Sequence, residues 1–511
     1  MSRSRSHIDI PNPPKRIRDL PGYPTGDLTG KLLEDVDIIR RTIQQAPDLI
    51  VRELDLTRAD GSRIPAAVLY MDGLANAEMI HKSILLPMVE SHVGDNPIRD
   101  LGRLILTAGS IEEQVQLAEI IYRLLFSSTI VLIDGIPKAL LICTEGWEHR
   151  TVSEPKTEPI GRGPQDAFNE VLRVNTALLR RRIKDPRLVF DNVRIGRRSL
   201  TDISIAYLQD VANPGIVQEI KNRLQHVDID MLTDGQMLAE FIEDHPISPF
   251  PQMAITERVD KTAVAISEGR VALIVDGTPG TVIVPITMTY FLFSTEDYYS
   301  KWLPVMLIRW LRVIALCIAL LLPSLYVAIS SYHQEMLPTG MMLQMAANRS
   351  GLPFPSYVEA LIMELSFELL REASLRMPGT LGQTIGIVGA IVIGSAAVEA
   401  GIVGPILTII VSFTAIGSFV IPSYNTSFAI RVIRFPLMIL SATLGLYGIL
   451  FGVIALLIHL NHLYSFGVPY MASFTPESMK DWNDSLLVRK PMPFQRERPS
   501  FLRVLNRKRK A

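Results

Sequence analysis

The sequence predicts an α+β soluble region, made of two duplicated α/β subdomains, followed by an α-helical polytopic membrane domain. Three observations lead to this fold class: the length of 511 residues, an internal repeat in the front half, and an apolar excess in the back half. Hydrophobic residues make up 48% of the chain and charged residues 20%, with a mean hydropathy of +0.25. The apolar excess lies between Val305 and Leu463. This distribution excludes a disordered scaffold, a small secreted domain and a purely soluble enzyme.

Composition along the chain predicts six consecutive segments. The first is a basic, flexible tail, and no apolar core follows its charges, so we expect no cleavable signal peptide and a cytosolic front half. The connector carries a helix that ends in a basic run, which we interpret as a solvated face; contact with anionic lipid or a neighbouring subunit is the alternative. The segments are residues 1–45 (tail), 46–150 (subdomain 1), 151–185 (connector and basic helix), 186–300 (subdomain 2), 301–465 (membrane domain) and 466–511 (basic C-terminal tail).

Two stretches of the front half resemble each other in order and spacing. Leu69–Asn76 is similar to Ala206–Asn213, 137 residues later, and Ile130–Gly135 is similar to Ala272–Gly277, 142 residues later. The second pair consists of apolar runs that end in Asp-Gly before another apolar run. That pattern is typical of a hairpin, because glycine tolerates the positive φ of a tight turn. The repeat predicts two α/β subdomains of related fold.

Long uncharged stretches predict the membrane domain. A helix needs about 20 mostly apolar residues to cross a bilayer, and four stretches supply them. They are Val313–Gln334, Met377–Val398, Ala400–Ile430 and Phe435–Ile458.

The number of crossings stays open between four and five. Basic residues at the start of the first span place that start in the cytosol: Lys301, Arg309 and Arg312. Nine Lys/Arg against one Glu between Arg489 and Lys510 favour a cytosolic C-terminal tail and an even number of crossings. Arg431 and Arg434 also favour the cytosol, and they require a fifth crossing, for which Phe354–Met377 is the candidate.

Motifs of catalysis and of cofactor binding are missing from the sequence. It contains no Walker A, GxSxG, HExxH or GxGxxG pattern, and its two cysteines form no metal pair. Asp134 and Asp276 are best explained as turn residues, and His459 with His462 has no third ligand nearby. A net charge of −1 gives no general attraction to nucleic acid. We therefore expect no enzyme activity, no cofactor, no metal and no nucleic-acid partner.

The stretch Thr384–Ala400 predicts a pore helix. Small residues spaced by four form a face that lets a neighbouring helix approach closely, and the opposite stripe is apolar and weakly polar with a carboxylate at one end. Plain helix packing, with that carboxylate at the membrane interface, is the alternative. The packing face is Gly386, Ala390 and Gly394, and the pore-lining candidates are Thr384, Val388, Ile391, Ser395 and Glu399.

An acidic stripe runs along the helix predicted over Phe354–Met377. Glu364, Glu368 and Glu372 are spaced by four, so they share one helix face that cannot contact lipid. We favour a salt-bridged face, either buried or at the surface. A vestibule that collects cations is the alternative.

Three segments carry a resemblance to a known family. The connector Ser153–Pro164 with Phe168 and Glu170, the helix Val358–Arg371, and the run Gly382–Ala390 look like the A subunits of the GerA-type spore germination receptors. The resemblance covers roughly residues 150–470. It implies a multi-pass protein of the spore inner membrane with its N-terminal domain in the cytosol. It also implies a ring of copies, a pentamer, that forms a nutrient-gated cation channel, together with a transporter-like B subunit that senses the nutrient and a lipoprotein C subunit.

Two other functions compete with the channel. A secondary transporter would be favoured by inverted repeats, but the only repeat in the sequence lies in the front half. A non-conducting scaffold for the sensing subunit would not respond to substitutions in the predicted pore stripe. The sequence names neither the nutrient nor the ion.

Overall fold

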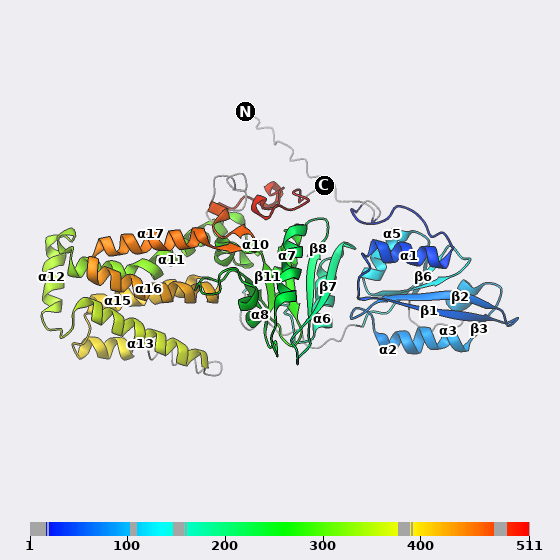
Figure 1. The fold of residues 1–511 in the computed structure, drawn as a ribbon, viewed down its shortest axis with the longest axis horizontal. Helices are drawn as coiled ribbons and strands as arrows, with labels where there is room; N and C mark the ends of the chain where they lie inside the picture. Colours follow the sequence, from blue (N-terminus) through cyan, green and yellow to red (C-terminus); the bar gives the residue numbers. More distant parts are fainter. Residues whose placement is uncertain are drawn as a thin grey trace, which may run out of the picture. The chain divides into compact units, whose positions relative to one another are not determined.

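The computed structural model describes residues 20–102, 110–146, 161–376, 392–474 and 488–509, with the single residues 17, 158 and 389. These form two compact units (Figure 1). Unit 1 combines Met1–Glu243, Met253–Pro285 and Met492–Ala511, and unit 2 combines Asp244–Gln252 and Ile286–Pro491. Unit 1 is mixed α/β and unit 2 is mainly helical, so the coarse fold class predicted from the sequence is confirmed.

Subdomain 1 is a six-stranded sheet of order β3-β1-β2-β5-β6-β4 with helices on both faces (Figure 1). All strand pairs are antiparallel except the short parallel pair β1–β3. Its elements are α1 (Leu32–Thr42), β1 (Leu49–Arg58), β2 (Arg63–Met71), α2 (Ala77–Ile80), the π-helical turn η2 (His81–Leu85), α3 (Leu86–Glu90), β3 (His92–Val93), α4 (Pro97–Asp100), β4 (Ile111–Gln114), α5 (Leu117–Leu125), β5 (Ser128–Ile133) and β6 (Ala139–Cys143).

Alternating side chains of the central strands fill two apolar cores, one on each face of the sheet. Along β2, Ala67 and Leu69 pack under α1 and α5, whereas Ala66 and Val68 pack under the helices between β2 and β4. Successive strand residues point to opposite faces, and this period of two makes both faces buried. Ser128–Ile133 is therefore buried at every position.

Subdomain 2 repeats this plan with five strands in the order β7-β8-β10-β11-β9, all antiparallel. Helices α6 and α9 pack in the core on one face, and α7 and α8 contact the strands as well. Its elements are α6 (Leu172–Arg182), β7 (Leu188–Ile195), β8 (Thr201–Leu208), α7 (Pro214–His226), α8 (Gly235–Ile242), β9 (Ala254–Thr256), α9 (Val259–Ser267), β10 (Val271–Val275) and β11 (Thr281–Val284).

The two subdomains share their strand register and one long-range anchor. Leu69 is opposite Ile130 in subdomain 1, and the matching residues Ala206 and Ala272 are opposite each other in subdomain 2. The N–H of Leu32 donates to Asp134 Oδ1 at 3.0 Å, and the N–H of Leu172 donates to Asp276 Oδ1 at 3.0 Å. Each Asp-Gly turn thus fixes the first residue of the helix that begins its own repeat.

The places of α1 and α6 differ from two domain boundaries expected from the sequence. The expected flexible tail, residues 1–45, contains α1, whose Val36 and Ile39 are buried in the subdomain 1 core. The expected connector, residues 151–185, contains α6, which is the first helix of subdomain 2. Both helices are held by an Asp that lies more than 100 residues further along the chain, so local composition does not reveal where they belong.

The segment expected as a basic C-terminal tail, residues 466–511, also carries structure. Two short helical turns, η8 (Met492–Phe494) and η9 (Ser500–Leu502), lie in it. Leu502 and Val504 are buried in the subdomain 2 core, and the N–H of Leu505 donates to the carbonyl of Val211 at 3.1 Å. Apolar side chains between the basic residues therefore tie this part of the tail to unit 1.

Unit 2 is built around α11, which contacts α13, α15, α16 and α17. Among the described residues, α11 and α16 are long and apolar enough to cross a membrane, and α15 and α17 are apolar but shorter. The elements are η4 (Met288–Leu292), α10 (Glu296–Tyr299), α11 (Trp302–Ser331), η5 (Gln334–Met336), α12 (Thr339–Arg349), α13 (Ser356–Arg376), α15 (Pro405–Val420), α16 (Tyr424–Leu444), α17 (Leu446–His462), β12 (Tyr464–Ser465), β13 (Val468–Pro469) and η6 (Ala472–Phe474).

Candidate functional site

Two ion pairs join α13 to α16 inside unit 2. Glu364 lies 2.8 Å from Arg434, and both side chains are 4% exposed. Glu368 pairs with Arg431, which is buried. Because positions four apart on α13 and three apart on α16 each share a helix face, the two pairs lie side by side. We call these four residues the α13–α16 charge cluster.

The charge cluster accounts for two of the three carboxylates in the predicted acidic stripe. Glu364 and Glu368 are neutralised by arginines, whereas Glu372, one turn further along α13, is exposed. The same pairing changes the meaning of Arg431 and Arg434. Their charges are paired with carboxylates, which weakens them as an orientation signal. The number of crossings stays a prediction.

The predicted pore helix is described only in part. Gly394 is buried, and a Cβ placed on it would lie 3.5 Å from the Cγ2 atom of Thr408 on α15. Ser395 and Glu399 are exposed. The other residues of the predicted packing face and pore stripe lie outside the described residues: Thr384, Gly386, Val388, Ala390 and Ile391. Their roles stay predictions.

A buried carboxylate in the segment before α11 pairs with two arginines in the first half of α11. The Oδ2 atom of Asp297 lies 3.2 Å from Arg309 Nε and 2.8 Å from Arg312 Nη1. Arg309 also lies over the ring of Phe293, at 4.2 Å from its centroid. The sequence identified the two arginines as orientation signals only. Their shared carboxylate, 12 and 15 residues earlier, fixes the segment before α11 against that helix.

Glu359, at the start of α13, is a buried carboxylate that the sequence analysis missed. Its side chain is fully buried, and Oε2 accepts a hydrogen bond from the N–H of Gly404 at 3.2 Å. Gly404 immediately precedes α15, so Glu359 caps that helix from a neighbouring one. Its spacing from Glu364 places it off the predicted acidic stripe, which is why the i, i+4 pattern did not reveal it.

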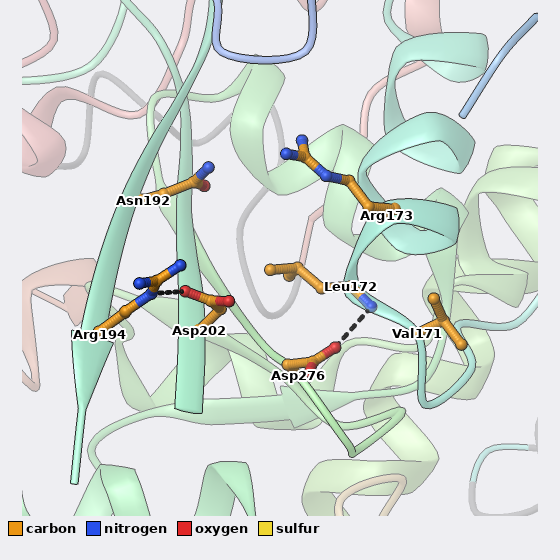
Figure 2. A pocket seen from close by; sticks show the side chains of 7 residues that line it. All are labelled: Val171, Leu172, Arg173, Asn192, Arg194, Asp202 and Asp276. Atoms are coloured by element: carbon orange, nitrogen blue, oxygen red, sulfur yellow. Dashed lines mark hydrogen bonds and ion pairs between the residues drawn. The ribbon is translucent and has the colours of Figure 1, made fainter. Parts of the chain in front are cut away.

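An open pocket of about 520 Å³ lies in subdomain 2, between the start of α6 and strands β7 and β8 (Figure 2). Its charged groups already have partners: Arg194 pairs with Asp202 at 2.7 Å, Arg173 pairs with Asp72 at 3.5 Å, and Asp276 accepts from the N–H of Leu172. A ligand would have to displace these contacts, so the arrangement is that of a paired polar surface. The pocket is also lined by Val171 and Asn192.

The two histidines at the end of α17 contact the segment Asp244–Gln252. His459 shares a hydrogen bond of 2.8 Å with Ser248, and the ring of His462 lies 5.3 Å from that of His245. No group of three or more His, Cys, Asp or Glu among the described residues is arranged to hold a metal ion. The contacts give the histidines a structural role in fixing this segment.

Comparison with known proteins identifies relatives along almost the whole chain. The family model described as Bacillus/Clostridium GerA spore germination protein matches residues 37–501. The spore germination protein GerLA of Bacillus cereus is 37% identical over 480 residues, which are 94% of this chain and 97% of that protein. The membrane protein YfkQ of Bacillus subtilis (strain 168) is 38% identical over 485 residues, 94% and 93% of the two chains. The crystal structure of the N-terminal domain of the A subunit of the Bacillus megaterium spore germinant receptor GerK3 is 28% identical, with a TM-score of 0.40, over 51% of this chain and 97% of that domain.

Proposed function

Because the chain belongs to the GerA family of Bacillus/Clostridium spore germination proteins, we propose that it is the channel-forming A subunit of a germinant receptor. Copies of the chain assemble into a ring, a pentamer by resemblance to the family, around a pore for monovalent cations. A transporter-like B subunit senses the nutrient, and a lipoprotein C subunit completes the receptor. Opening of the pore releases ions from the spore and starts germination.

The observation that carries this proposal is the two-sided character of the helix that ends at Glu399. Gly394 is buried against α15, whereas Ser395 and Glu399 are exposed on the single chain, as are Val392 and Ile393. A helix that contacts its own chain on one face and leaves weakly polar residues open on another is suited to line a pore between copies. A ring of Glu399 carboxylates at one mouth would attract cations.

The α13–α16 charge cluster supports the placement of the pore at the Glu399 helix, because the cluster itself is unsuited to select ions. Its two carboxylates and two arginines balance each other and are largely buried, so the cluster offers no net charge to a permeating ion. Its role in this proposal is to hold α13 and α16 together while the pore helix moves. Charge selection then falls to exposed carboxylates such as Glu399.

The chain arrangement favours an even number of crossings. Unit 1 contains the segments before unit 2 and also Met492–Ala511, which follows it. If unit 1 lies in the cytosol, the chain leaves and re-enters the same compartment. Of the four or five crossings that the sequence allows, this argument favours four. The protein is then a multi-pass protein of the spore inner membrane.

Potassium release tests the channel. We would compare wild type, Val388→Ala and Ile393→Ala in vesicles with matched amounts of assembled protein. Val388 is on the predicted pore stripe, whereas Ile393, five residues further along the same predicted helix, is expected to face elsewhere. A leak in Val388→Ala alone supports a closed gate at Val388. Equal impermeability of all three, with assembly intact, contradicts the pore assignment and favours the scaffold.

A further inference from the structure

Two buried oxygen atoms at the start of α13 lack a hydrogen-bond partner among the described residues. They are Oγ of Ser356 and Oε1 of Glu359, and both side chains are fully buried. Residues three apart on a helix are neighbours on one face, so the two side chains lie one turn apart. Buried polar atoms are almost always bonded, and each exception requires an explanation.

Capping of α15 explains only one of the two carboxylate oxygens of Glu359. Oε2 accepts from the N–H of Gly404, and the positive end of the 16-residue helix α15 favours a negative charge there. That hydrogen bond does not satisfy the second carboxylate oxygen, Oε1. A negatively charged carboxylate with one empty oxygen in a closed site is unfavourable unless a further group binds it.

The surroundings supply no direct cationic partner within the described part of the chain. Arg349 and Tyr326 are close enough to interact electrostatically with Glu359. Arg349, however, donates to the carbonyl of Ser330 at 3.3 Å, and no ion pair joins it to Glu359 among the described residues. The neighbouring core is apolar and includes Ala360 and Val403.

We propose that Oγ of Ser356 and Oε1 of Glu359 bind a monovalent cation, sodium or potassium, that fastens the start of α13 to the start of α15. Oxygen atoms are the ligands that such hard cations prefer, and one carboxylate balances one positive charge. A divalent ion would keep an uncompensated positive charge beside the single Glu359 carboxylate in this apolar core, so a monovalent ion is favoured. The site is structural and does not depend on the proposed conduction.

The test is the thermal unfolding midpoint of the purified full chain in detergent. Sodium chloride or potassium chloride would replace N-methylglucamine chloride at constant ionic strength. A cation that binds only the folded protein raises the midpoint in a saturable manner. We expect this rise in wild type, its loss in Glu359→Gln, and an apparent dissociation constant several-fold weaker in Ser356→Ala. The ion with the lower apparent constant is the preferred occupant.

Glu372→Gln is the matched control, because Glu372 lies on the same helix, is exposed and should leave the cation dependence unchanged. A wild-type midpoint that is the same in all three salts overturns the proposal and indicates that Oε1 holds a proton instead. A larger rise with magnesium chloride overturns the choice of a monovalent ion. If Glu359→Gln does not fold, Ser356→Ala decides: an unchanged titration contradicts the site. None of these outcomes depends on potassium release by Val388→Ala.

Discussion

Glu364 and Arg434 face each other across 2.8 Å, and each side chain is 4% exposed. The pair connects α13 to α16 and lies beside the second pair of the charge cluster, Glu368 with Arg431. Transfer of two charges out of water costs free energy, which the mutual attraction offsets only while both partners are present. The cluster is therefore sensitive to the loss of one partner and tolerant of the loss of both.

Glu364→Gln is expected to destabilise the full chain by about 3–5 kcal/mol, because it leaves Arg434 charged and unpaired in a buried site. The thermal midpoint in detergent measures this effect. Glu372→Gln is the control: Glu372 is exposed, so its loss should cost only about 0–1 kcal/mol. The double variant Glu364→Leu/Arg434→Leu should recover most of the lost stability. A double variant as unstable as Glu364→Gln would contradict this account.

The equivalent aspartates Asp134 and Asp276 are expected to act each on its own repeat. Removal of a side chain that accepts from the first turn of a helix typically costs about 1 kcal/mol. Asp276→Ala should therefore speed amide hydrogen exchange at the start of α6, and Asp134→Ala should do so at the start of α1. Asp230→Ala, at an exposed carboxylate, should change neither helix. Equal effects of Asp276→Ala on both helices would show that the anchors are not local to their repeats.

The repeat could be predicted from the sequence because its signal is local. The apolar run, the Asp-Gly turn and the next apolar run lie within about 14 residues, and Gly135 and Gly277 have the positive φ that such a turn requires. The helix that begins each repeat could not be assigned in this way. Leu32 and Leu172 meet their aspartates across 102 and 104 residues, and no local pattern records that contact.

Hydropathy also did not predict the helix ends that lie inside uncharged stretches. The predicted span Ala400–Ile430 is divided between α15 and α16, and Phe435–Ile458 is divided at Gly445, whose φ is +61°. Apolar composition does not change at either break, so only backbone conformation reveals them. The ion pairs of the charge cluster could not be predicted from local sequence either. Glu364 and Glu368 are 70 and 63 residues from their arginines, Arg434 and Arg431.

The C-terminal tail is expected to contribute to the stability of unit 1 through Leu502. This side chain is 1% exposed in the subdomain 2 core, and a buried Leu→Ala change costs about 2–5 kcal/mol. Leu505, three residues later, is 61% exposed, so Leu505→Ala should change stability by less than about 0.5 kcal/mol. Limited proteolysis of the tail and the thermal midpoint measure both variants. Equal effects would mean that the tail does not pack as described.

The same tail permits a direct test of the number of crossings. Cys143 in β6 and Cys317 in α11 are free and exposed on the single chain. In a Cys317→Ala background, Leu505→Cys adds a thiol to the tail beside the natural one in subdomain 1. We expect a membrane-impermeant maleimide to label both thiols in inside-out vesicles and neither in right-side-out vesicles, because an even number of crossings leaves them on one side. In a Cys143→Ala variant, Cys317 should stay unlabelled in both, since a thiol in lipid does not form the reactive thiolate. Labelling of Cys143 and Leu505→Cys from opposite sides would require an odd number of crossings and would contradict the four proposed from the attachment of Leu502 to unit 1.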